Sequence, residues 1–245
     1  VGSFSAVAYY FAKSLRKHVD VPIGIVNSSW GGTRIEPWMS PASYGTDAAN
    51  AEIEAALEEM EAARRRIMIK FGGDLPVRDM GLEAGIAHWA QPDLDDARWD
   101  LIDVPGIWED QEYVGIDGIA WYRFDLNLEP EDVGDGSGTI HFGRIDDSDI
   151  TWINGVEVGR MTAASSVTRA YDIAAGVLRP GKNVIAVRVT DTGGAGGLRG
   201  SNEEFVVSTN QGDHSMTGKW KIRFGRVDMP ETRINHQLPT VIFNQ

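Results

Sequence analysis

Residues 89–227 alternate short apolar segments with turns rich in glycine, asparagine and proline. Asn154-Gly155 stands between two such segments, and both residues tolerate the positive φ that a tight hairpin needs. Regularly spaced short strands with turns of this kind predict an all-β sandwich. The strands that we expect lie at residues 119–128, 139–142, 150–153, 156–158, 183–190 and 219–224.

A different pattern precedes this region. Apolar residues recur on one helical face over residues 4–15, and Ser3 stands at the expected N-cap. Residues 23–27 then form a continuous apolar run, which is typical of a buried parallel strand. Residues 1–38 therefore predict a helix–strand–loop slice of an α/β domain. A second helix is expected from Asp47 to about residue 69, because one face of that segment is apolar and the other is rich in Glu and Arg.

The segment after the expected strand carries the most chemical information. Gly31 and Gly32 lie within Asn27-Ser28-Ser29-Trp30-Gly31-Gly32-Thr33-Arg34, at the carboxyl end of that strand, where open α/β sheets bind ligands. Paired glycines let backbone N–H groups approach a ligand closely. Such groups stabilise the oxyanion of ester hydrolysis. A plain structural turn is the alternative, and spacing alone does not separate the two.

Several blocks together resemble the sialate O-acetylesterase family of SGNH hydrolases. The matching blocks are Phe4-Ser5-Ala6-Val7-Ala8-Tyr9-Tyr10-Phe11, Pro22-Ile23-Gly24-Ile25-Val26, Ser29-Trp30-Gly31-Gly32-Thr33 and Ile35-Glu36-Pro37-Trp38. The resemblance implies a carboxylic ester hydrolase that removes O-acetyl groups from sugars by serine chemistry. It also implies that the backbone N–H of Gly32, with Gly31 as the alternative, contributes to the oxyanion hole. A periplasmic or secreted location is part of the same expectation.

The later blocks resemble a galactose-binding-like jelly roll inserted into the SGNH domain. They include Asp95-Asp96-Ala97-Arg98-Trp99, Asp117-Gly118-Ile119-Ala120-Trp121-Tyr122-Arg123 and Trp152-Ile153-Asn154-Gly155. We therefore expect partial SGNH (flavodoxin-like) α/β segments that flank a β-sandwich insert. The expected boundaries are residues 1–88 for the first α/β part with its helical connection, 89–227 for the sandwich and 228–245 for a truncated return to the SGNH domain.

The resemblance also implies what an internal fragment would lack. The family's nucleophilic serine block is expected before residue 1, and its Asn and Asp-His blocks after Gln245. No Gly-x-Ser-x-Gly elbow is present, and no local pattern places a histidine beside Ser28 or Ser29. This chain by itself is therefore predicted to be inactive, with the rest of the SGNH domain on another chain as an expected partner. A non-catalytic carbohydrate-binding or spacer module is the alternative function.

Charge and composition limit the partners. The net charge of −13 disfavours nucleic acid, which needs clustered cations, and no apolar run approaches the roughly 20 residues that cross a bilayer. The expected ligand is an O-acetylated sugar such as sialic acid or a polysaccharide unit. Cysteine is absent, which excludes thiol catalysis and Cys-ligated zinc.

No cofactor and no metal are predicted. Asp146, Asp147 and Asp149 offer oxygen ligands to calcium, but a turn with solvated or N–H-bonded aspartates is the favoured interpretation. The glycine-rich run 193–197 lacks the dinucleotide-binding spacing and is predicted to be a loop. Tryptophans of the sandwich offer either a sugar-stacking platform or core side chains, and their position in strand patterns favours the core.

Overall fold

The computed structural model describes residues 6–25 and 46–228, and the chain divides into two compact units. One unit comprises Leu57–Glu231, and the other combines Val1–Ala56 with Thr232–Gln245. Helix α1 (Ala6–Leu15) belongs to the second of these, and α3 (Thr46–Lys70) runs from one unit into the other. Among the helices described, none is both long enough and apolar enough to span a bilayer.

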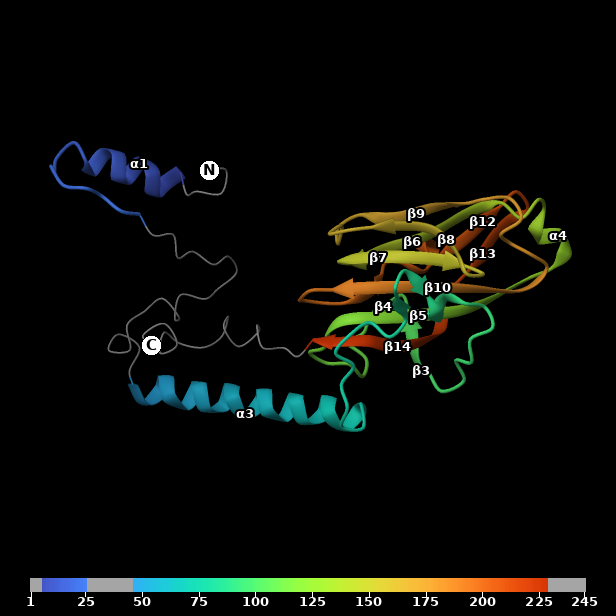
Figure 1. Cartoon of the computed structure of the whole chain (residues 1–245), viewed down its shortest axis with the longest axis horizontal. Coiled ribbons are helices and arrows are strands. Elements are labelled where there is room, and N and C mark those ends of the chain that lie inside the picture. The colour runs from blue at the N-terminus through green and yellow to red at the C-terminus, as the bar shows by residue number, and fades with distance from the viewer. Residues whose placement is uncertain (1–5, 26–45, 229–245) are drawn as a thin grey trace. The chain divides into compact units, whose positions relative to one another are not determined.

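Two antiparallel sheets form a β-sandwich in the unit Leu57–Glu231 (Figure 1). The first sheet has the order β3-β14-β5-β10-β7-β8, and the second has the order β13-β12-β6-β11-β4 with β9 paired to β6. The strands of the first sheet are β3 (Asp100–Val104), β5 (Asp117–Leu128), β7 (Ser148–Ile153), β8 (Val156–Met161), β10 (Gly181–Asp191) and β14 (Gly218–Asp228). Those of the second are β4 (Gly106–Ile107), β6 (Gly138–Asp146), β9 (Thr168–Ile173), β11 (Gly197–Arg199), β12 (Val206–Thr209) and β13 (Gly212–Ser215).

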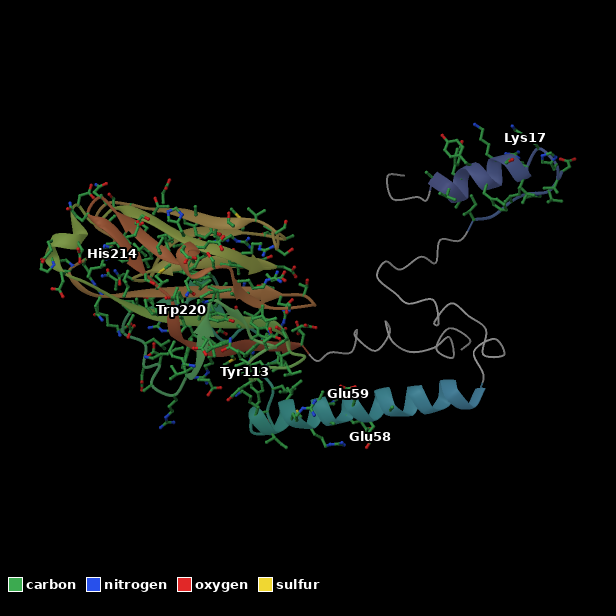
Figure 2. The ribbon with its side chains drawn as sticks, turned by 180° about the vertical axis from the view of Figure 1, so that it is seen from behind. Lys17, Glu58, Glu59, Tyr113, His214 and Trp220 are labelled. Atoms are coloured by element: carbon green, nitrogen blue, oxygen red, sulfur yellow. The ribbon has the colours of Figure 1, made fainter. Side chains whose placement is uncertain are left out.

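The main core fills the space between the two sheets. Tyr122 of β5 and Val187 of β10 point into it from the first sheet, and Ile140 and Phe142 of β6 point into it from the second. Trp220 lies in the middle of the sandwich and is fully buried (Figure 2). Alternate residues of a strand face opposite sides of its sheet, so β5 and β10 contribute about every second side chain to this core.

The other face of the first sheet is also covered. Residues 79–99, which we call the covering segment, include the hairpin β1 (Leu82–Glu83) and β2 (Ile86–Ala87) and the 3-10 helix η2 (His88–Ala90). Apolar side chains of this segment pack against Trp121, Trp152 and Ala186 in a second, smaller core. The central strands β5 and β10 are therefore buried on both faces, which explains their nearly continuous apolar sequences.

Short elements complete the sandwich. Helix α4 (Pro130–Val133) has Pro130 in its first turn, and the 3-10 helix η3 (Asn202–Glu204) precedes β12. The hairpin between β7 and β8 turns at Asn154 and Gly155 with φ angles of 52° and 83°. The turn that the Asn-Gly signal predicted is therefore confirmed.

The expected SGNH-type α/β segments are not shown. In residues 6–25, α1 is helical but has no buried residue, and residues 23–25 form no strand. A buried parallel strand needs neighbouring strands and cover on both faces, and Val7 and Phe11 of α1 are 80% and 68% exposed. Residues 26–27 of the expected strand and the predicted return at 229–245 lie outside the described residues. The predicted boundaries of the three domains stay predictions.

Candidate functional site

Asp79 fastens the start of the covering segment to the first sheet. Its Oδ1 accepts hydrogen bonds from the indole Nε1 of Trp121 and from the backbone N–H of Gly81, both at 2.9 Å. Its Oδ2 accepts a hydrogen bond from Arg188 Nε at 2.6 Å. Because the carboxylate has a cation and two neutral donors, its burial is compensated.

Arg123 fastens the other end of the segment. This side chain is 1% exposed and donates from Nε to Asp96 at 2.7 Å and from Nη1 to the carbonyl oxygens of Trp89 and Gln91 at 2.6 and 3.1 Å. Burial alone would raise the pKa of Asp96, but hydrogen bonds from Lys221 and Arg123 outweigh burial and hold that pKa below its usual value. The backbone beside Trp89 is thus anchored from β5.

The tryptophans of the region build the second core. Trp89 makes edge contacts with Trp99 and Trp121 at ring-centroid distances of 5.2 and 6.0 Å, and Trp121 stacks on Trp152 at 5.2 Å. Trp99, Trp121 and Trp152 are buried. The preference for core positions is therefore confirmed for these three side chains. Trp89 is half-buried, and it lines a surface pocket together with Trp99.

That pocket has a volume of about 580 Å³ and lies within the unit that contains the sandwich. Its size falls in the range of small-molecule sites. The charged side chains in its lining are Lys70, Asp74, Arg98, Asp100 and Arg223. The aromatic side chains in its lining are Phe71, Trp89, Trp99, Tyr113 and Phe224.

Cations lie over two of the pocket's aromatic rings. Arg223 lies 5.1 Å from the ring centre of Trp89, and Lys70 lies 4.4 Å from that of Tyr113. The Tyr113 hydroxyl (Figure 2 labels this residue) donates to Asp100 Oδ2 at 2.6 Å. Burial, together with this hydrogen bond, raises the pKa of Tyr113 well above its usual value. The phenol therefore stays neutral and holds Asp100 at the rim.

This combination of groups suits a neutral, hydroxyl-rich ligand. Aromatic rings offer apolar contact to the C–H faces of a sugar ring, and charged side chains at a rim hydrogen-bond its hydroxyl groups. Arg98 and Arg223 are exposed, so their guanidinium groups are accessible to such a ligand. Both charge signs line the pocket, which disfavours selection for a strongly charged partner.

The site residues predicted from sequence do not belong to the described part of the chain. Gly31 and Gly32, the expected oxyanion donors, lie outside the described residues, as do Ser28 and Ser29. Within the described ranges, no ion pair joins a histidine to a carboxylate, and the ring nitrogen of His214 lies 3.5 Å from a threonine hydroxyl. The described residues thus present no Ser-His-acid arrangement.

Asp146, Asp147 and Asp149 do not share a site. Asp149 accepts from Arg169 Nε at 2.8 Å deep in the sandwich, and Asp146 accepts from Arg199 Nη2 at 2.7 Å. Asp147 accepts two hydrogen bonds from one threonine, at 2.6 and 3.0 Å. The turn interpretation therefore holds for Asp147, which accepts a backbone N–H. It is wrong for Asp149, which is buried in β7 and paired with a cation.

A different acidic cluster lies at one end of the sandwich. Glu109, Asp117 and Asp191 each place a carboxylate oxygen within 4.8 Å of the others. Backbone N–H groups of Gly193 and Gly196 donate to Asp191 and Glu109 at 2.8 and 3.0 Å. Burial, followed by the charge of Asp117, raises the pKa of Asp191 to about 6, against the hydrogen bond from Gly193. Sequence reasoning missed this cluster, because its members lie far apart in the chain.

No family model and no curated protein sequence matches the chain. A β-glucuronidase from an uncultured Clostridium species is 24% identical, with 46% of this chain and 20% of that chain covered and a TM-score of 0.36. A glycosyl hydrolase family 2 member from Bacteroides cellulosilyticus is 21% identical, with 59% and 19% covered and a TM-score of 0.40. A Bifidobacterium dentium β-glucuronidase is 19% identical, with 42% and 16% covered and a TM-score of 0.37. The matches thus span a fifth or less of these proteins, and they carry no activity over to this chain.

The predicted membership of the sialate O-acetylesterase family is wrong, since the similar structures are glycosidases and nothing among the comparisons points to such an esterase. The prediction of a carboxylic ester hydrolase acting on O-acetylated sugars is corrected with it. The physical reason lies in the motifs. Blocks such as Trp152-Ile153-Asn154-Gly155 form a strand and a hairpin turn, and they report a sandwich fold rather than an activity.

Proposed function

We propose that this chain is a non-catalytic carbohydrate-binding module, a jelly-roll type of β-sandwich that holds a sugar in the pocket beside Trp89. The observation that carries the proposal is the lining of that pocket, where the half-buried indole of Trp89 lies beside exposed arginines and the buried Tyr113 closes the lining. A protein surface that combines ring faces with convergent polar groups is the usual form of a small-ligand site.

Rigidity of the pocket supports the same proposal. Trp89 is fixed by ring contacts with Trp99 and Trp121 and by the hydrogen bond from Arg123 to its carbonyl oxygen. Tyr113 is fixed by its bond to Asp100. A preformed site loses little conformational entropy when a ligand binds. The rings therefore keep their positions when a weakly binding neutral sugar enters, and only the cation over Trp89 has to move.

The test is calorimetric titration of the whole chain with galactosides, sialosides and xylo-oligosaccharides. Arg98→Ala and Arg223→Ala remove two exposed donors of the pocket, and Arg144→Ala is a matched control at an exposed arginine of β6 outside the pocket lining. A hydrogen bond to a charged group is worth about 1.5–3 kcal/mol, so each pocket variant should raise Kd by about tenfold or more. The control should leave Kd unchanged.

Two results would count against the proposal. Sugar binding that survives both pocket variants would place the site elsewhere. Absence of binding to all three sugar classes would favour a spacer module. One contact favours this second candidate, since Arg223 already lies over the ring of Trp89 and competes with a sugar for that face.

A further inference from the structure

Three acidic side chains from both sheets meet at one end of the sandwich. Asp117 begins β5 and Asp191 ends β10, and the register of these paired strands sets Asp191 opposite Gly118. Glu109 follows β4 of the second sheet. Each of the three carboxylates has one oxygen that lies within 4.8 Å of an oxygen of each of the other two. The cluster therefore joins the two layers of the fold.

Burying these carboxylates without a neighbouring cation is unfavourable in free energy. Asp117 is 5% exposed and Asp191 is 0% exposed. Asp191 accepts a backbone hydrogen bond from Gly193, but a neutral donor does not cancel the charge of a buried carboxylate. Buried carboxylates are normally paired with a cation or bind a metal. The neighbouring cation Arg199 is already paired with Asp146.

A second observation points to a ligand at the same place. Oδ2 of the fully buried Asp191 has no hydrogen-bond partner, and neither has the hydroxyl of Tyr122, which is also 0% exposed. The Tyr122 hydroxyl lies beside the connection that follows Asp191, because a Cβ built on Gly197 would meet that oxygen at 3.3 Å. Buried polar atoms without partners are rare in folded proteins, and a missing ion is one of their accepted causes.

We propose that Glu109, Asp117 and Asp191 bind a calcium ion that links the two sheets. Calcium takes six to eight oxygen ligands at 2.3–2.6 Å, so two of its ligands can lie up to about 5 Å apart. The three oxygens lie within 4.8 Å of one another, which is compatible with that ion. Magnesium requires strict octahedral geometry at 2.0–2.1 Å and usually keeps several of its waters, which a buried set of carboxylates does not favour. Zinc is disfavoured because the set has oxygen ligands only.

The ion would act on the connection between the sheets. The chain leaves the first sheet at Asp191 and enters the second at Gly197, where β11 pairs with Ile107 of β4. Glycines 193, 194 and 197 have positive φ, so this connection has little intrinsic stiffness. An ion held by Asp191 at the start of the connection and by Glu109, which accepts a hydrogen bond from Gly196 near its end, would fix the connection and stabilise the sandwich, independently of sugar binding.

The test uses the whole chain after removal of metal with EDTA. Terbium, a luminescent substitute for calcium, should bind and be excited through Trp108, because the indole lies against Gly196 beside the cluster. Calcium should displace the terbium, give a binding isotherm in calorimetry and raise the melting temperature. Loss of a direct ligand should weaken binding by at least the ~10-fold that outer-shell changes produce. Asp191→Asn should show that loss.

Asp110→Asn is the matched control, since this exposed carboxylate follows Glu109 directly and undergoes the same change of charge. Its calcium affinity should equal that of the wild type. Asp191→Asn also removes one of the mutually repelling charges, so the metal-free variant should melt no lower than the metal-free wild type. If that variant fails to fold, Glu109→Gln, at a half-buried position, provides the same comparison. Absence of calcium binding to the wild type, or unchanged affinity in the ligand variants, would overturn the proposal.

Discussion

Arg123 holds the covering segment on the first sheet, and its removal tests that account of the structure. The change Arg123→Met keeps a long side chain but removes the bonds to Asp96 and to the carbonyl oxygens of Trp89 and Gln91. Those bonds anchor the backbone of η2 and of the residues that follow it, beside the pocket. We therefore expect unfolding to become easier and the pocket to lose its fixed shape.

The magnitude follows from what remains after the change. Loss of one partner from a buried ion pair costs about 3–5 kcal/mol, because the other charge is left uncompensated. Here Lys221 still donates to Asp96, and Arg123 Nη2 is itself buried without a partner, so its removal relieves a penalty. Both effects reduce the cost. We expect a loss of about 2–3 kcal/mol in the free energy of unfolding.

The assay is urea unfolding followed by tryptophan fluorescence, because six of the eight tryptophans lie at residues 89–220. Arg144→Met is the control at an exposed arginine of β6. An equal m-value in both variants would show that the same surface is exposed on unfolding. A loss below about 1 kcal/mol, or one equal to that of the control, would refute the idea that Arg123 fastens the segment.

Three further changes test other parts of the sandwich. Arg169→Met removes the cation that pairs with the fully buried Asp149 and should cost about 3–5 kcal/mol in urea unfolding, whereas a neutral result would contradict that pair's role. Gly159→Ala would set a Cβ 2.1 Å from Cδ1 of Tyr171 and should cost about 1–3 kcal/mol by calorimetry, and an unchanged melting temperature would show that the ring has room to move. The lowered pKa of Asp96 means that its carboxylate stabilises the fold above the unfolded-state value of 3.8, and that this contribution is lost as the pH falls through the lower folded-state value. The difference in unfolding free energy between wild type and Asp96→Asn should therefore be constant from neutral pH to about pH 5 and shrink below about pH 4. A difference that grows in acid would show that the pKa of Asp96 is raised in the fold, not lowered.

Local sequence patterns were sufficient to predict the most regular parts of the fold. The predicted strands 119–128 and 183–190 lie within β5 and β10, and the helix expected from Asp47 to about residue 69 is α3. All three elements are long, and in β5 and β10 the pattern of apolar residues is caused by burial, whereas Ile67 is the buried one among the described side chains of α3. The Asn154-Gly155 turn was also recognised, since few residues tolerate its φ angles.

Other strands escaped prediction for identifiable reasons. In β9 the inward positions are Arg169, Tyr171 and Ile173, and a charged residue at a core position breaks the expected alternation. The arginine is tolerated because Asp149 of another strand neutralises it, which local sequence does not show. Strand β13, with the sequence Gly-Asp-His-Ser, has no apolar residue and owes its place to backbone pairing with β12.

The sequence and the tertiary structure also determined different features of the candidate sites. Sequence alone determined that a sandwich with tight turns forms and that tryptophans occupy its strands, because strand and turn propensities act over a few neighbouring residues. The sequence also suggested an esterase. That prediction was wrong because short motifs that several folds share do not identify an activity by themselves. Only the tertiary structure decided that Trp89 and Tyr113 line one pocket and that Glu109, Asp117 and Asp191 converge. Strand register and the crossing between the sheets bring these residues together across separations of up to 82 positions in the chain, and no local pattern records such contacts.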